Sequence, residues 1–112
     1  MLTIKTYIAN SPINGMGCFA GENIKKRSVI WVLEKQFDVV LTDDVLATLS
    51  QQARDYIKHF AYLNKNEGGY VLCSDNAKYF NHSVTPNCIG IGNFTVAIKD
   101  IQEGEEITED YF

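Results

Sequence analysis

Cysteine is scarce in this sequence, and its spacing excludes two kinds of small-protein scaffold. The 112 residues contain three cysteines, Cys18, Cys73 and Cys88, and no Cys-x-x-Cys pair. An odd number of distant cysteines does not indicate a disulfide framework, and structural zinc sites usually need closely spaced pairs. We therefore expect no metal site, and we expect the three thiols to be buried as small apolar side chains rather than catalytic.

Positive charge is also in short supply. Acidic residues number 14 and basic residues 10, so the net charge is -4 at neutral pH. A phosphate-binding surface needs the opposite balance, which argues against direct nucleic-acid binding. An acidic protein is instead compatible with a basic peptide as its partner.

The sequence has no long apolar run and no leader-like beginning. Residues 2–8 already alternate apolar and polar side chains, as a strand does, and no basic region with a following apolar stretch precedes them. We expect a soluble, intracellular protein that does not associate with membranes. The cytoplasm is the default compartment, and a host nucleus is the alternative for a viral protein or a secreted effector.

Turn-forming residues occur at short intervals, which favours many small strands over long elements. At 112 residues and 46 % hydrophobic content, the chain is large enough for one core, and we expect a single domain over residues 1–112. Thr42 offers an N-cap, and apolar side chains then recur at three- and four-residue steps, which predicts one helix from about Asp43 to about His59. Strands are predicted around it at residues 2–8, 18–21, 29–33, 70–73, 94–99 and 106–108.

Two segments near the end of the sequence carry the most specific pattern. Residues 81–88 read Asn-His-Ser-Val-Thr-Pro-Asn-Cys, and residues 104–112 read Gly-Glu-Glu-Ile-Thr-Glu-Asp-Tyr-Phe. Each is a short string, but their order and spacing together resemble the two signature segments of the SET-domain protein-lysine methyltransferases. Residues 11–20 look like the glycine loop of that family, and residues 29–33 look like its early strand. The similarity is greatest to small stand-alone SET proteins of bacteria and viruses.

The resemblance implies a mainly β structure, the SET-domain or β-clip fold of several small curved sheets. It also implies one helical insert at about residues 42–62 and a C-terminal segment threaded beneath a loop that residues 76–88 form. Such threading is rare among proteins, and this family uses it to bring the two signature segments to one site. No post-SET segment, the cysteine-rich extension of larger relatives, follows residue 112 in this sequence. Three alternatives follow: a second subunit of a homodimer completes the site, the helical insert completes it, or the domain is an incomplete and weak enzyme.

The resemblance also assigns roles to individual residues. Tyr111 is the expected catalytic residue, whose hydroxyl orients the substrate amine near the transferring methyl group. The expected cofactor is S-adenosyl-L-methionine, with S-adenosyl-L-homocysteine as product. Its expected binding residues are Gly15, Met16, Gly17, Asn81, His82, Tyr111 and Phe112. Tyr70 and Tyr111 are expected to line the channel for the lysine side chain, and Tyr70 and Phe112 could also form walls of the adenine pocket.

Methyl transfer to lysine is an in-line displacement that needs a neutral amine aligned with the methyl donor. A free lysine side chain, with a pKa of about 10.4, is protonated at neutral pH, so the site must lower that pKa. Desolvation and the positive charge of the donor both do so, and the proton is lost to water. We therefore expect positioning to be most of the catalytic work, without a strong general base.

Each assignment has a plainer structural alternative. A Gly-x-Gly pair is usually only a turn, and an isolated histidine is usually a hydrogen-bonded structural residue, so we expect His82 to act mainly through its main chain. Lys78 stands where relatives usually have arginine, a conservative change. Most acidic side chains of the second segment are expected to be solvated, with Glu109 or Asp110 lining the approach of a basic substrate.

The sequence therefore predicts an S-adenosylmethionine-dependent protein-lysine N-methyltransferase that acts on a lysine of a basic or histone-like protein. The alternative is a SET module of weak activity that binds a lysine-containing peptide or a partner protein without methylating it.

Overall fold

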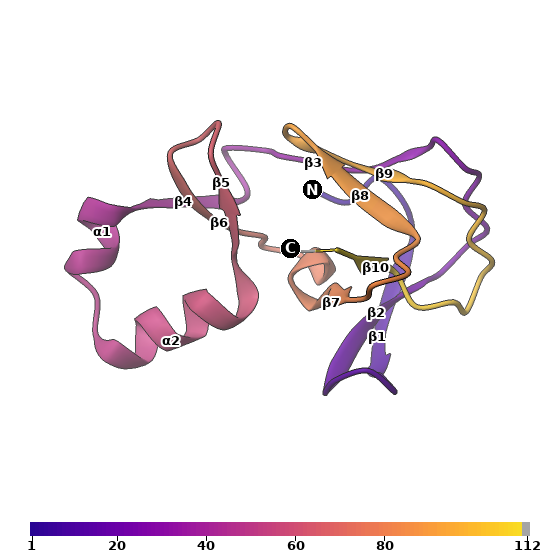
Figure 1. The fold of residues 1–112 in the computed structure, drawn as a ribbon, viewed down its shortest axis with the longest axis horizontal. Helices are drawn as coiled ribbons and strands as arrows, with labels where there is room; N and C mark the ends of the chain where they lie inside the picture. Colours follow the sequence, from indigo (N-terminus) through magenta and orange to yellow (C-terminus); the bar gives the residue numbers. More distant parts are fainter. Residues whose placement is uncertain (111–112) are drawn as a thin grey trace.

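The computed structural model describes residues 1–110 of the chain, and in this range the elements are short and mostly strands (Figure 1). In chain order they are β1 (Thr6–Asn10), β2 (Met16–Ala20), β3 (Val29–Val32), β4 (Val39–Thr42), α1 (Asp43–Ala47), α2 (Gln51–Phe60), β5 (Tyr62–Asn64), β6 (Gly69–Leu72), the 3-10 helix η1 (Asn76–Tyr79), β7 (Asn81–His82), β8 (Cys88–Ile91), β9 (Phe94–Ala97) and β10 (Thr108–Glu109). The mainly β class that the sequence predicts is confirmed.

The strands of residues 1–110 form three small sheets. β1 pairs with β2, a five-stranded sheet has the order β3-β9-β8-β10-β7, and a third sheet has the order β4-β6-β5. The third sheet and both α-helices lie together at one end of an elongated molecule of 42 × 26 × 24 Å, and the other two sheets occupy the opposite end (Figure 1). The principal cavity described below lies where these two parts meet.

The N-terminal alternating run does not form a single strand. Leu2 makes an isolated antiparallel bridge with Trp31, and the amide of Thr3 donates to the carbonyl of Ile30 at 2.9 Å. From Thr6 onward the chain pairs with β2 instead. The run alternates throughout, as predicted, but it serves two different strand partners and therefore bends between them.

The single helix expected in the insert is two helices. α1 ends at Ala47, and the side chain of Ser50 then accepts a hydrogen bond from the amide of Ala53 at 3.2 Å, which caps a new helix. Thr42 stands at the N-cap of α1 as predicted, but its side chain makes no capping bond. A serine that satisfies the free amides of a first turn competes with helix continuation, which explains the break.

The last described strand, β10, is threaded between β7 and β8. It runs parallel to both, with Thr108 opposite Asn81 and Glu109 opposite both His82 and Cys88. Residues 83–87 join β7 to β8, so this link must cross β10. The predicted threading is therefore present. The final strand begins at Thr108 rather than at the expected Glu106, which makes an isolated bridge with Phe19 instead.

The core draws buried side chains from strands of all three sheets and from η1. Its largest fully buried side chains are Ile30, Ile101, Ile107, Val71, Cys18 and Cys88. Burial raises the pKa of the Cys18 and Cys88 thiols to about 12, and it raises that of Cys73 as well, so these groups are neutral and unreactive near neutral pH. In residues 1–110 no group of three or more metal-binding side chains occurs, and no helix there has the length and apolarity to cross a membrane.

Candidate functional site

The two signature segments and the glycine loop meet at the carboxylate of Glu106. The side-chain amide of Asn81, in β7, donates to Glu106 Oε2 at 2.8 Å. The same nitrogen lies 3.1 Å from the carbonyl of Asn14 and 3.3 Å from the carbonyl of Met16. Asn81 therefore ties the glycine loop and the final segment to one point of the central signature, and its amide hydrogens are used within the protein.

The glycine loop is shaped to admit this carboxylate. Ser11 Oγ lies 2.7 and 2.8 Å from the two carboxylate oxygens of Glu106. A Cβ at Gly17 would overlap Glu106 Oε2, so a larger residue here would force the Glu106 side chain to shift. Gly15 has a φ of +49°, which favours glycine, and nothing lies within 4 Å of the place a Cβ would take. Both glycines are expected from the sequence to bind the cofactor, and Gly17 also leaves room for Glu106.

Most of the predicted cofactor residues line one small cavity. It has a volume of about 350 Å³, and its walls include Gly15, Met16, Asn81 and His82. Gly17 is buried outside it, and Tyr111 and Phe112 lie outside the described residues. The remaining walls come from the loop, α2 and η1 and consist of Asn14, His59, Phe60, Lys78, Tyr79 and Phe80.

Lys78 brings a positive charge to this cavity, a role that the sequence motifs did not predict. Its Nζ lies 3.1 Å from the hydroxyl of Tyr56 and between 5.4 and 5.8 Å from the ring centres of Tyr56, Phe60 and Tyr79. The hydrogen bond to Tyr56 raises the pKa of Lys78, so the ammonium stays charged at neutral pH. The sequence signal for this role was the position of Lys78, three residues before Asn81. Because η1 leads directly into β7, both side chains reach the same cavity.

His82 takes part in the threaded crossing. It lies opposite Glu109 in the pairing of β7 with β10, and its Nδ1 is 3.5 Å from Asp110 Oδ1. Its neighbour Ser83 donates its amide hydrogen to the carbonyl of Glu109 at 2.9 Å. These contacts support a structural role for His82, although it also lines the smaller cavity.

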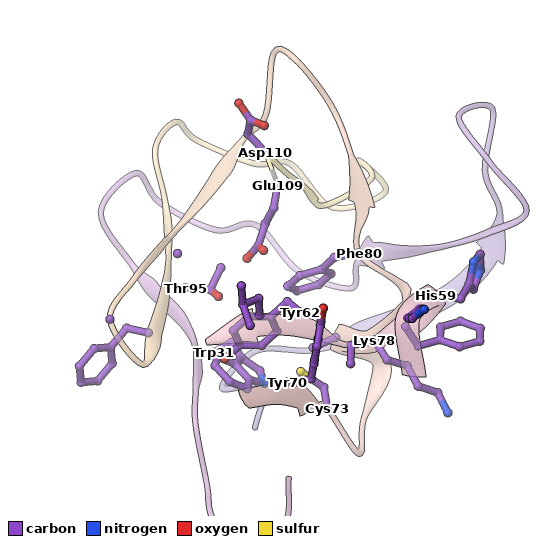
Figure 2. Close-up of a pocket in the computed structure, with 18 residues that line it drawn as sticks. Trp31, His59, Tyr62, Tyr70, Cys73, Lys78, Phe80, Thr95, Glu109 and Asp110 are labelled. Atoms are coloured by element: carbon purple, nitrogen blue, oxygen red, sulfur yellow. The ribbon is translucent and has the colours of Figure 1, made fainter. Parts of the chain in front are cut away.

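A larger cavity, of about 620 Å³, lies between the third sheet and the five-stranded sheet (Figure 2). Tyr70, the residue predicted for the lysine channel, lines it from β6. Trp31 and Tyr62 form another wall, with ring centres 6.0 Å apart and an edge-to-face angle of 83°. The two cavities share the residues His59, Phe60, Lys78 and Phe80, so they adjoin one another.

Glu109 supplies the larger cavity with a carboxyl group. Figure 2 shows its side chain pointing inward beside Thr95, while the carboxylate of Asp110 points the opposite way. Burial raises the pKa of Glu109, and a hydrogen bond from Thr95 opposes that shift only in part. Its Oε1 is buried and has no hydrogen-bond partner in the part of the chain that the structure describes.

The arrangement can hold two ligands side by side. One cavity offers a lysine ammonium, aromatic rings and an open glycine turn, and the other offers aromatic walls around a carboxyl group. Group transfer requires such adjacent sites because donor and acceptor must be held in contact and in line.

Comparison with known proteins identifies the family of the chain. The model of the family described as SET domain matches residues 15–112. Histone-lysine N-methyltransferase trr of Drosophila melanogaster is 29 % identical over 125 residues, covering 94 % of this chain and 5 % of that protein. Histone-lysine N-methyltransferase 2D of Homo sapiens is 25 % identical over 116 residues, covering 94 % of this chain and 2 % of that protein. The chain therefore spans only a small fraction of these relatives.

A solved structure shows the same architecture over almost the whole chain. It is the crystal structure of a Plasmodium falciparum protein proposed to be a histone methyltransferase, and it superposes with a TM-score of 0.70 at 25 % identity. The superposition covers 99 % of this chain and 96 % of that one. With a threaded β10, a glycine loop joined to the central signature and a family model that matches most of its length, the chain belongs to the SET domain family.

Proposed function

We propose that the protein is an S-adenosylmethionine-dependent protein-lysine N-methyltransferase. One observation carries the proposal above all. The glycine loop and the central signature line one small cavity, which adjoins a larger aromatic one, although Met16 and Asn81 are 65 residues apart in sequence. The histone-lysine methyltransferase names of the relatives support the same reaction class.

The residues of the smaller cavity fit the chemistry of the cofactor. The ammonium of Lys78 suits the cofactor's carboxylate, and the rings of Phe60 and Tyr79 suit a flat adenine. The open turn at Gly15 leaves the loop backbone accessible to the cofactor. When bound, S-adenosylmethionine supplies an activated methyl group.

Asn81 acts by holding the cofactor cavity together. Its amide joins the carbonyls of Asn14 and Met16 to Glu106, so its loss would free the glycine loop from β7. A loop that must be ordered on binding lowers affinity, because the cost of ordering is then taken from the binding free energy.

The larger cavity is the proposed site of the substrate lysine, with Tyr70 among its walls. Aromatic faces accommodate both the alkyl chain and the charged head of lysine. The net charge of -4 favours a basic, histone-like substrate. Tyr111, assigned from the sequence, would orient the amine toward the methyl group.

The test is calorimetric titration with S-adenosylmethionine, followed by transfer of tritiated methyl groups to a histone mixture and to lysate of the source cell. For Asn81→Ala we expect binding weaker by about one to two decades, corresponding to the loss of roughly 1.5–3 kcal/mol from hydrogen bonds to a charged group. Asn66→Ala is the matched control, because Asn66 is exposed and lines neither cavity. Unchanged affinity in a folded Asn81→Ala protein would refute the site.

The second candidate function is a SET module that binds a lysine-containing peptide without methylating it. The aromatic cavity with its carboxyl group suits a bound lysine side chain as well as it suits a lysine that is to be methylated. Cofactor binding with no transfer to any histone or lysate protein would support this module over the enzyme. The homodimer predicted from the sequence is a separate proposal, which light scattering at micromolar concentration tests.

A further inference from the structure

Two buried side-chain atoms lack hydrogen-bond partners within residues 1–110, and both belong to residues that line the larger cavity. They are Nε1 of Trp31, which is a donor, and Oε1 of Glu109, which is an acceptor. Buried polar atoms in folded proteins are nearly always paired, so each such atom needs an explanation. The unpaired acceptor of Glu109 indicates a ligand that brings a polar hydrogen to the larger cavity.

The backbone fixes Glu109 in this position. It is the second residue of β10, paired on one side with His82 and on the other with Cys88. The side chain of the preceding Thr108 is directed to Asn87, and because side chains alternate along a strand, that of Glu109 points to the opposite face. The pairing of β10 with β7 and β8 therefore fixes the backbone from which the Glu109 side chain reaches the larger cavity.

The surroundings of Glu109 select a positively charged ligand. Among the described residues no salt bridge neutralises it, since the Lys78 ammonium is bonded to Tyr56 and lies over aromatic rings. The walls near the carboxyl group are the rings of Trp31, Tyr62 and Phe80 (Figure 2). A neutral ligand would leave the carboxylate unpaired, and an anion would be repelled, whereas an alkylammonium group meets both the charge and the rings.

We infer that Glu109 receives the ammonium group of the substrate lysine and takes its proton before methyl transfer. This inference rests on the proposed function, and it replaces the expectation from the sequence that the lysine loses its proton directly to water. In the step, an N–H bond of the ammonium breaks and an O–H bond forms on Glu109, so that both charges disappear and the nitrogen lone pair becomes available for attack. After transfer, the carboxyl group releases its proton to water as the methylated product leaves.

The environment favours this direction of proton transfer. Desolvation raises the pKa of Glu109, and the same desolvation lowers that of an amine in the cavity, so both shifts favour transfer of the proton to Glu109. The titratable groups that interact with Glu109 from packed elements are Tyr62, Cys73 and Cys88. Burial raises the pKa of all three, so they stay neutral. His82 and Asp110 face each other at the crossing. The other titratable groups lie on the α2 and η1 side of the cavity and are Lys58, His59 and Lys78.

The first experiment measures ammonium recognition without the cofactor. Wild-type protein is titrated with n-butylammonium chloride and, separately, with 1-butanol, and the ¹³C carboxyl signal of Glu109 is followed by NMR. We expect n-butylammonium to bind at least fivefold more tightly than 1-butanol at pH 7.5 and to move the Glu109 signal. Equal binding of the two compounds, or an unmoved Glu109 signal, would overturn the inference even if every variant failed to fold.

The second experiment compares Glu109→Gln with Glu103→Gln, an exposed carboxylate on the turn before β10. For Glu109→Gln we expect S-adenosylmethionine affinity within twofold of wild type, loss of the preference for n-butylammonium, and transfer at least tenfold slower at pH 7.5. The slow transfer should recover tenfold per pH unit, because solvent must then deprotonate the lysine. If Glu109→Gln transfers methyl groups at the wild-type rate and with the wild-type pH profile, the role of Glu109 is overturned. If the wild-type protein does not bind S-adenosylmethionine, the proposed function is overturned and the proton step with it.

Discussion

Asn87 and Thr108 exchange two hydrogen bonds where the chain crosses itself. The amide of Asn87 donates to Thr108 Oγ1 at 3.3 Å, and the amide of Thr108 donates to Asn87 Oδ1 at 2.9 Å. The side-chain nitrogen of Asn87 also donates to the carbonyl of Glu106 at 2.7 Å. Both residues are buried, so this exchange fixes β10 beneath the link formed by residues 83–87.

Asn87→Ala should therefore destabilise the crossing strongly. It leaves the amide of Thr108 and the carbonyl of Glu106 without their partners, at a cost of about 1–3 kcal/mol for each buried group. Urea unfolding followed by circular dichroism measures the change. Val84→Ala is the control in the same link, because Val84 is 85 % exposed and its truncation should stay within about 0.5 kcal/mol of wild type. Equal stability of the two variants would contradict the role of Asn87.

Gly17→Ala should lower stability because the new methyl group overlaps the Glu106 carboxylate. Overpacking of a buried position typically costs about 1–3 kcal/mol, and here it also disturbs the bond between Asn81 and Glu106. Gly90→Ala is the matched control in a strand, since the nearest atom to its Cβ is 4.0 Å away. Thermal melting of both proteins distinguishes them, and a Gly17→Ala protein as stable as Gly90→Ala would show that Glu106 can move aside without cost.

Ser50→Ala should weaken α2, whose last residue Phe60 lines both cavities. Loss of a capping side chain typically costs about 1 kcal/mol. Thr42→Ala at the N-cap of α1 should cost much less, since Thr42 makes no capping bond. Unfolding midpoints in urea compare the two, and a larger loss from Thr42→Ala would be inconsistent with the helix break at residues 48–50.

Glu109→Gln should remove a pH-dependent loss of stability. The folded-state pKa of Glu109 lies above its ordinary value of 4.5, so the folded protein binds more protons than the unfolded chain above that pH. Wild-type stability is fully present below about pH 4.5 and falls as pH rises through the folded-state pKa. The stability difference between Glu109→Gln and wild type should therefore grow with pH in this window, as urea unfolding from pH 4.5 to 8 will show. A difference that is constant with pH would mean that Glu109 titrates normally.

Tyr111→Phe should keep the fold and cofactor binding but lose most methyl transfer. Removing a hydroxyl leaves the aromatic volume nearly unchanged, whereas an interaction made mainly in the transition state affects turnover more than affinity. Melting temperature, S-adenosylmethionine affinity and single-turnover transfer are measured side by side with wild type. Transfer at the wild-type rate would reduce Tyr111 to an aromatic filler and remove it from the mechanism.

Local sequence signals were sufficient for the class of the fold and for several element positions. Alternation, turn residues and a helical period are properties of neighbouring residues, so they predicted many short strands and helical structure between β4 and β5. They did not predict the break between α1 and α2, because a periodic apolar pattern continues across Ser50 while its hydroxyl ends the hydrogen-bonded series. They also did not show that residues 2–8 change partners near Lys5, because a strand's partner is not encoded in its own alternation.

The site divides in the same way. Two short signature segments identified the SET family, and four of the residues expected from that resemblance to bind the cofactor, Gly15, Met16, Asn81 and His82, line one cavity. The sequence could not show that the Asn81 amide is bonded to Glu106 or that Lys78 enters the same cavity. The first contact joins Asn81 and Glu106, which are 25 positions apart in sequence, and the second depends on the direction in which η1 leaves β6.

By its own residues, the sequence determined the family, the small-sheet architecture and the segments that form the site, since these follow from local patterns and from two signature strings. The tertiary structure alone decided what individual carboxylates do. Glu106 accepts hydrogen bonds from Ser11 and Asn81, whereas Glu109, three residues later, lines an aromatic cavity and has an unpaired oxygen. The physical reason is that burial and partners, not residue type, set the charge and reactivity of a carboxyl group, and both arise only when β10 is threaded between β7 and β8.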